Sequence, residues 1–202
     1  YKDLPRLLQN PYLETELLAA RGRAYGAEIS LRKNRGAITG WLSYAYGRTL
    51  RRVAGNFPEE IINGGDWFPA PFDQPHQVNL VSNIKINRRN TLSVNFIYST
   101  GRPITVPVGD FIAGSAVVPI YSDRNQFRIP DYHRLDLSYT VKTFAIRKQR
   151  YQDSFTFSLY NLYFRRNAFS VFFEPDDRQI PRTFLLAVIG TAIPALTYNF
   201  NF

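Results

Sequence analysis

The last seven residues of the chain alternate strictly between apolar and polar side chains. Leu196, Tyr198, Phe200 and Phe202 share one parity, and threonine and asparagine fill the positions between them. A period of two predicts a β-strand with one apolar and one polar face. Because soluble termini seldom end on apolar aromatics, we expect the apolar face to meet lipid. Taken alone, this segment fits a terminal edge strand of a soluble sandwich equally well.

The same alternation recurs along the chain and predicts an all-β protein. No segment of helical period has a useful length, although residues 1–20, predicted as a loop, include a short helical turn at 13–20. We expect the last strand to bend at Gly190 or Pro194. The seven predicted strands cover residues 21–32, 37–50, 77–87, 91–100, 132–141, 153–173 and 182–202.

The composition fits a protein whose surface is partly apolar and partly exposed to water. The chain carries 13 tyrosines and 16 phenylalanines, yet its mean hydropathy is −0.26. It has no cysteine, which excludes disulfide scaffolds, thiolate nucleophiles and cysteine-based zinc sites. No apolar run reaches 18 residues, so no transmembrane helix is predicted. The chain begins at Tyr1 without a signal-like segment, and we expect a mature protein or a fragment.

The connections alternate between short and long, and their charges differ. A soluble sandwich and a membrane barrel both produce two-faced strands, so alternation alone does not separate them. The short connections hold three, three and four cations and no acid, whereas the long connections hold most of the acids. Short turns at one end and long loops at the other are typical of outer-membrane barrels. The basic residues of the short turns are Arg32, Lys33, Arg35, Lys85, Arg88, Arg89, Lys142, Arg147, Lys148 and Arg150.

The formal charge of +9 does not by itself indicate a nucleic-acid partner. The cations lie in three separate turns with few aromatic residues between them, which differs from the stacking grooves of proteins that bind single-stranded nucleic acid.

The odd number of predicted strands gives a second inference. Seven strands place the two chain ends on opposite sides of a membrane, and seven is fewer than the minimum of eight for a barrel. We therefore expect the C-terminal part of a larger transmembrane antiparallel β-barrel, with 1–20 as an extracellular loop segment and 21–202 as barrel wall.

Candidate chemistry is sparse. His133, Asp131 and Ser138 can be drawn as a triad, but nothing in the sequence places Ser138 near the other two, so no catalytic residue is predicted. Metal-ligand spacing is absent, and no cofactor is expected. Glu28, Arg134 and Asp136 fall on polar faces and are expected to face the lumen and join hydrogen-bond networks with a plug or with adjacent strands. The candidate aromatic-girdle residues are Tyr44, Tyr46, Tyr98 and Tyr139.

Several motifs occur in an order and spacing that resemble one family. They include Asp73-Gln74-Pro75-His76, Thr100-Gly101-Arg102-Pro103, and Asp123-Arg124-Asn125 followed by Arg128-Ile129-Pro130-Asp131-Tyr132-His133-Arg134. Tyr160-Asn161-Leu162-Tyr163 and the terminal Phe202 complete the set. Over residues 21–202, the chain resembles the C-terminal barrel part of TonB-dependent outer-membrane receptors of the Bacteroidetes type.

This resemblance implies the last seven strands of a 22-stranded barrel plugged by an N-terminal domain. The implied function is import of a specific ligand across the bacterial outer membrane, driven through TonB, ExbB and ExbD. Implied partners are outer-membrane lipid and the barrel assembly machinery, which reads a terminal signal at Phe202. Some relatives also work with a surface lipoprotein, and the resemblance leaves this partner open. The resemblance does not imply nucleic acid as a partner. The loop residues expected to contact ligand, or else to pack against neighbouring loops, are Asp66, Trp67, Tyr121, Arg124 and Asn125.

Two other functions stay open at this point. One is a structural or secretion-associated outer-membrane barrel that binds protein partners instead of importing nutrients. A plug domain and a TonB box upstream of Tyr1 would favour import, and their absence would favour this alternative. The other is a soluble β-sandwich binding module.

Overall fold

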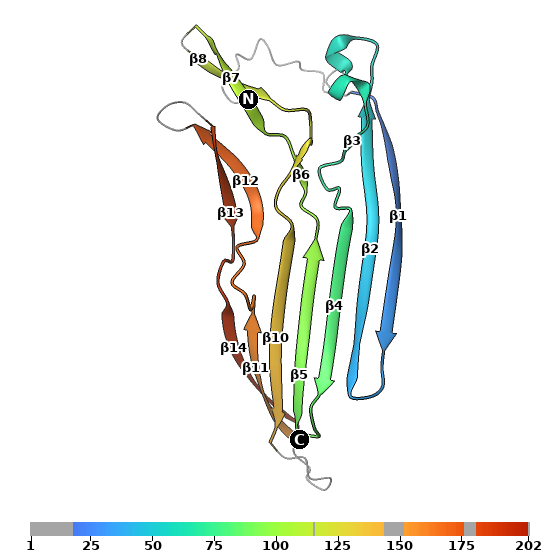
Figure 1. The fold of residues 1–202 in the computed structure, drawn as a ribbon, viewed down its shortest axis with the longest axis vertical. Coiled ribbons are helices and arrows are strands. Elements are labelled where there is room, and N and C mark those ends of the chain that lie inside the picture. The colour runs from blue at the N-terminus through green and yellow to red at the C-terminus, as the bar shows by residue number, and fades with distance from the viewer. Residues whose placement is uncertain (1–17, 115, 144–151, 176–180, 202) are drawn as a thin grey trace.

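The computed structural model describes residues 18–114, 116–143, 152–175 and 181–201, and its main feature is one large antiparallel sheet (Figure 1). The prediction of an all-β protein is confirmed. Seven strands follow one another across the sheet, and the two-residue strand β3 (Phe68–Pro69) pairs with β2 beside this path. In sheet order the seven are β1 (Ala20–Lys33), β2 (Ile38–Val53), β4 (His76–Lys85), β5 (Asn90–Ser99), β10 (Tyr132–Lys142), β11 (Gln152–Tyr160) and β14 (Ile193–Asn201).

Short polar turns join neighbouring strands at one end of the sheet. Between β4 and β5, the Asn87 side-chain oxygen accepts hydrogen bonds from the backbone N–H groups of Arg89 and Asn90, both at 2.8 Å. Such an asparagine turn closes a hairpin without help from the rest of the fold. Just after the β1–β2 turn, Gly40 has a φ of 155°, and a Cβ there would lie 2.0 Å from the Val81 carbonyl oxygen. Only glycine allows β2 and β4 to approach this closely.

The pairing register gives the sheet one continuous apolar face and one largely polar face, on which Trp41, Val81 and Ile97 are exceptions. Residues directly opposite one another share a face, so each row can be followed across the strands. Two apolar rows run Leu31–Leu42–Leu80–Phe96–Leu135 and Ile38–Ile84–Leu92–Tyr139–Phe157–Leu196. Two polar rows run Thr39–Asn83–Ser93–Ser138–Ser158 and Lys85–Thr91–Thr140–Thr156–Thr197.

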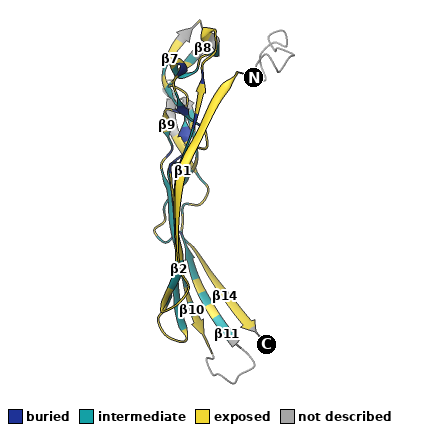
Figure 2. Ribbon diagram, turned by 90° about the vertical axis from the view of Figure 1, so that its right-hand side faces the viewer, coloured by how far each residue is buried: buried dark blue, intermediate teal, exposed yellow. Residues whose placement is uncertain are grey.

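The sheet is a single curved layer, seen nearly edge-on in Figure 2. Over the described residues, no second sheet packs on either face of the seven strands. Ile29 and Leu31 on the apolar face are 57% and 60% exposed. The outer strands β1 and β14 do not pair with each other, so the described strands form an open sheet.

The small buried core lies at the end with the long connections, where the chain forms additional elements (Figure 1). They are the 3-10 turns η3 (Pro58–Glu60) and η4 (Asn63–Gly65) and the strand pairs β6 (Pro103–Ile104) with β9 (Phe127–Arg128), β7 (Pro107–Ala113) with β8 (Ala116–Tyr121), and β12 (Ala168–Pro175) with β13 (Pro181–Ala187). The buried apolar residues are Leu50, Val53, Phe68, Ala70 and Ile129. Of the described helices, none is long and apolar enough to cross a membrane.

Two predicted strands are each interrupted, which corrects the sequence prediction. The predicted strand at 153–173 separates into β11 and β12, and the one at 182–202 separates into β13 and β14. The second interruption contains Gly190, one of the two predicted bend positions, whereas Pro194 lies inside β14. Of the predicted helical turn at 13–20, residues 13–17 lie outside the described residues, and Ala20 already begins β1.

Asn161 causes the first interruption. It adopts a left-handed φ of 56°, which ends β11, and it is almost completely buried. Its side-chain oxygen accepts the Arg165 N–H at 3.1 Å, and its side-chain nitrogen donates to the carbonyl oxygens of Arg165 (3.1 Å) and Thr191 (3.3 Å). One amide therefore connects both interruptions, which lie side by side.

We predict that Asn161→Gly destabilises the protein by about 2 kcal/mol, because the partly buried hydrogen bonds from this side chain to the backbone of Arg165 and Thr191 are lost. Phe164→Gly is the matched control, since Phe164 is also left-handed (φ 58°) but 62% exposed. Both changes put glycine at a left-handed position, so they differ mainly in the lost amide. Thermal unfolding of the purified protein measures the difference. Equal stability of the two variants would contradict the role given to the Asn161 side chain.

Candidate functional site

A buried ion-pair cluster ties the long connections together at the end of the sheet. The Asp73 side chain is fully buried and binds the Arg128 guanidinium, and it accepts the Thr49 N–H at 2.6 Å. Arg128 also donates to the carbonyl oxygens of Asp73 (2.6 Å) and Gly101 (2.8 Å). Arg48 Nε lies 3.4 Å from Asp73, close enough for an ion pair but without hydrogen-bond geometry. Two connections more than 50 residues apart thus share one buried carboxylate.

Two of the residues predicted to contact ligand form hydrogen bonds between these loops. The Arg124 backbone and the Asn63 side chain exchange two hydrogen bonds, of 2.7 and 2.9 Å. Asn125 is buried with a φ of 59°, and its side chain donates to the Pro69 carbonyl oxygen at 2.7 Å. These contacts match the expectation of packing between loops. The sequence did not reveal Asn63, because its partner lies 61 positions away.

The other three predicted loop residues do not converge on one place. Trp67 lies under the Arg23 guanidinium, 4.4 Å from the ring centroid. Asp66 is exposed beside it, and no side-chain partner of Asp66 occurs among the described residues. Tyr121 is 59% exposed at the end of β8. None of the five predicted loop residues lines the main pocket described next.

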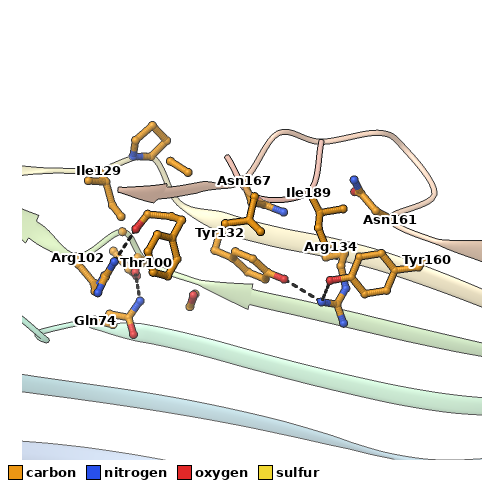
Figure 3. Close-up of a pocket in the computed structure, with 16 residues that line it drawn as sticks. Gln74, Thr100, Arg102, Ile129, Tyr132, Arg134, Tyr160, Asn161, Asn167 and Ile189 are labelled. Atoms are coloured by element: carbon orange, nitrogen blue, oxygen red, sulfur yellow. Dashed lines mark hydrogen bonds between the residues drawn. The ribbon is translucent and has the colours of Figure 1, made fainter. Parts of the chain in front are cut away.

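A pocket of about 420 Å³ opens on the polar face at the long-connection end (Figure 3). Its floor comes from the ends of β5, β10 and β11, through Ser99, Tyr132 and Tyr160. One wall is formed by the connection that holds Thr100 and Ile129, and the opposite wall by the residues around the two strand interruptions. The wall residues of this second group are Asn161, Asn167, Ala168, Phe169, Val188 and Ile189.

Arg134 organises the polar side of the pocket. Its guanidinium pairs with Asp136 at 2.9 Å and donates to the hydroxyl oxygens of Tyr132 (2.9 Å) and Tyr160 (2.5 Å). It also lies over the Tyr160 ring, 4.0 Å from the centroid. The two tyrosine rings are therefore held in place at the floor, as Figure 3 shows. Rigid aromatic rings with fixed hydroxyl groups favour binding of a ligand that has both apolar and polar surface.

Asp136 extends this network to the neighbouring strands. Its oxygens accept the Asn161 N–H at 2.9 Å and the Asn95 side-chain N–H at 3.3 Å. Arg134 and Asp136 thus join adjacent strands, one of the two kinds of network expected for them. Glu28 lies on the same face, opposite Ala45 and four strands away along the sheet order, and does not take part. Phe202 lies outside the described residues.

Arg102 and Asn167 attach the β12–β13 hairpin to the pocket. Arg102 donates to the Phe169 carbonyl oxygen at 2.6 Å, and its guanidinium is 5.9 Å from the Phe169 ring centroid. The Asn167 side chain accepts the His133 N–H at 3.1 Å and donates to the His133 carbonyl oxygen at 3.0 Å. Neither residue was predicted as a site residue. Their partners depend on the interruption after β11, which strand periodicity alone did not show.

The triad drawn from the sequence is not formed. His133 lies on the apolar face, where its ring nitrogen is 2.7 Å from the Tyr163 hydroxyl, and Ser138 lies on the polar face. Asp131 instead accepts hydrogen bonds from the Tyr98 hydroxyl (2.6 Å) and the Gly101 N–H (2.9 Å). Within the described ranges, no group of three or more His, Cys, Asp or Glu residues could hold a metal ion. The polar groups that line the pocket are hydroxyl, amide and guanidinium groups.

Comparisons with known proteins add no family to this description: no family model, no curated protein and no solved structure matches the chain.

The bonds to Asp131 predict how stability depends on pH. The Tyr98 hydroxyl and then the Gly101 N–H lower the pKa of the Asp131 carboxyl below its usual value. Its ionised form therefore stabilises the folded state above the unfolded pKa of about 3.9, and this stabilisation is lost as pH falls through the lower folded pKa. We predict that Asp131→Asn loses less stability than the unsubstituted protein between about pH 5 and pH 2.

Asp66→Asn serves as the control, because Asp66 is exposed and none of the described side chains bonds to it. Thermal unfolding of all three proteins across this pH range makes the comparison. Parallel pH profiles for Asp131→Asn and the unsubstituted protein would show that this carboxylate is not stabilised by its bonds.

Proposed function

We propose that this chain is part of the wall of a transmembrane β-barrel in the bacterial outer membrane, belonging to a TonB-dependent receptor that imports a specific ligand. The observation that carries the proposal is the continuous apolar face of a single-layer sheet. The resemblance of the sequence motifs supplies the receptor class and the expected 22-stranded, plugged architecture.

The apolar face argues for lipid on energetic grounds. Moving one large apolar side chain out of water contributes roughly 1.5–3 kcal/mol. A face that carries such residues on all seven strands therefore represents tens of kcal/mol, whereas a whole domain is stable by only about 5–15 kcal/mol. Something must cover this face, and the described residues supply no second layer. A hydrocarbon bilayer covers it without any further protein.

The ends of the apolar face also fit a bilayer. Tyr44 and Tyr98 lie near the long-connection end and Tyr139 near the short-turn end, and all three are on the apolar face. Tyr44 pairs with His76 at 2.8 Å, and Tyr98 with Asp131 at 2.6 Å. Aromatic residues with a polar tip favour membrane–water interfaces. Long connections at one end and short turns at the other support an extracellular and a periplasmic side, respectively.

The open edges support membership of a larger barrel. Among the described strands, β1 and β14 each pair with a strand on one side only, and an unpaired edge is not tolerated in hydrocarbon. Earlier strands of the same protein would pair with both edges.

In such a barrel the polar face would line the lumen, where Arg134, Asp136 and Glu28 would face a plug. The pocket at the long-connection end would be open to extracellular ligand. TonB, ExbB and ExbD would act through the plug, and the barrel assembly machinery and a possible surface lipoprotein are further proposed partners.

Fractionation tests the proposal directly. The protein should sediment with outer membranes, require detergent for extraction, and migrate differently on gels before and after heating. Recovery as a soluble monomer without detergent would reject it. Import is then separated from a structural or secretion-associated barrel by the sequence upstream of Tyr1, where a plug domain and a TonB box are expected.

A matched pair of substitutions tests which face meets lipid. Leu137 lies on the apolar face opposite Val94 and Leu159, and its neighbour Ser138 lies on the polar face. Leu137→Arg should cost about 2–4 kcal/mol and block assembly if this face lies at the bilayer midplane. Ser138→Arg should be tolerated, because it points to water. Heat-modifiable migration measures assembly of each variant, and equal tolerance of both would count against the membrane assignment.

A further inference from the structure

The basic side chains at the two ends of the sheet differ in how many bonds they form within the fold. At the long-connection end, arginines such as Arg128, Arg134 and Arg165 form ion pairs or hydrogen bonds within the fold. At the short-turn end, Arg32 donates to the Asn34 side chain at 2.9 Å. The charged side chains of the other described cations of these turns bond to no described side chain, and all six residues are exposed. They are Lys33, Arg35, Lys85, Arg88, Arg89 and Lys142.

The short turns form one continuous edge. The Lys85 N–H donates to the Ala37 carbonyl oxygen at 2.7 Å, and the Lys142 N–H donates to the Arg89 carbonyl oxygen at 2.9 Å. Each turn is thus joined to the next by a backbone hydrogen bond, at the lower end of the sheet in Figure 1. We call this edge the basic rim. It consists of Arg32, Lys33, Arg35, Lys85, Arg88, Arg89 and Lys142.

The basic rim has no internal compensation for its charge. It contains no acidic residue, and Asp153 follows it at the start of β11, where the Asp153 carbonyl oxygen accepts the Thr143 N–H. Seven like charges on one edge repel one another, so the edge favours binding of anions. The rim also borders the apolar face, whose last rows include Leu92, Tyr139 and Val141. Long basic side chains beside an apolar surface can keep their stems on it and their charges in water.

We propose that the basic rim binds the phosphate groups of anionic phospholipids in the leaflet around the short-turn end. This inference rests on the proposed membrane location. The cations follow the edge of the sheet one after another instead of gathering in a pocket, which suits many separate headgroups lying in one plane. Arginine and lysine both bind phosphate strongly.

Lipid titration followed by native mass spectrometry tests this on the full-length protein in detergent. The probes are phosphatidylglycerol and phosphatidylcholine. Each basic residue near an anionic surface strengthens association about fivefold. The variant Arg35→Gln/Arg88→Gln/Arg89→Gln should therefore lose at least about tenfold of its preference for phosphatidylglycerol. The matched control removes three arginines from the other end, as Arg21→Gln/Arg51→Gln/Arg166→Gln, and should keep the preference.

The outcomes separate the two proposals. If the protein is soluble and never shows heat-modifiable migration, the membrane assignment fails and this inference fails with it. If the protein inserts but both triple variants bind phosphatidylglycerol equally, only this inference is rejected. Displacement of the lipid by an equal concentration of inorganic phosphate would also reject it, because the rim would then bind any phosphate rather than lipid. Loss confined to the rim variant, weakened by added salt, supports it.

Discussion

The structure depends on the register of its seven-stranded sheet. Because side chains alternate with a period of two, a slip of one residue in any strand would move its apolar side chains to the polar face. No slip occurs along the path from β1 to β14, so Leu31 on the first strand and Leu196 on the last lie on the same face. The usual reason to maintain register is a buried core, yet here the core is small and lies at one end. The requirement for uniform register therefore comes from whatever covers the apolar face, and a lipid bilayer would impose it on every strand at once.

At the long-connection end, ion pairs hold the loops in place, a role that apolar packing has in most domains. Asp73, fully buried, binds Arg128, and Arg134 binds Asp136 with two tyrosine hydroxyl groups around it. A buried charge that loses its partner is strongly destabilising, so such clusters fix one arrangement of the loops. A fixed arrangement is what a binding pocket needs, since loops ordered only by the ligand would weaken its affinity. The loops and the pocket floor are thus held by separate ionic clusters joined through the Gly101 region.

The sequence predicted what is local and missed what is not. Alternation located the seven strands of the large sheet, and parity placed Arg134 and Asp136 on the polar face, where they bond to adjacent strands. The interruption at Asn161 was missed because apolar residues continue at the same parity on both sides, at Leu159 and Tyr163; an asparagine at an apolar position was the one available signal. The β6–β9 and β7–β8 pairs inside the second long connection were missed because this segment contains several prolines, which argue against strands. Asp73 was noticed only as part of a motif, since its partner Arg128 lies 55 residues away.

The side chain of Asn167 has a consequence for how this protein can change over evolutionary time. Its amide satisfies both the N–H and the carbonyl oxygen of His133, as the backbone of a neighbouring strand residue would. The chain can therefore leave the sheet after β11 without exposing an unpaired backbone group of β10. The β12–β13 hairpin between this point and the return near Ile193 can therefore vary more than the sheet strands, because no ladder of the large sheet runs through it. If the sheet is the membrane wall proposed above, a lineage could acquire new ligand preferences by exchanging this hairpin while inheriting an unchanged sheet.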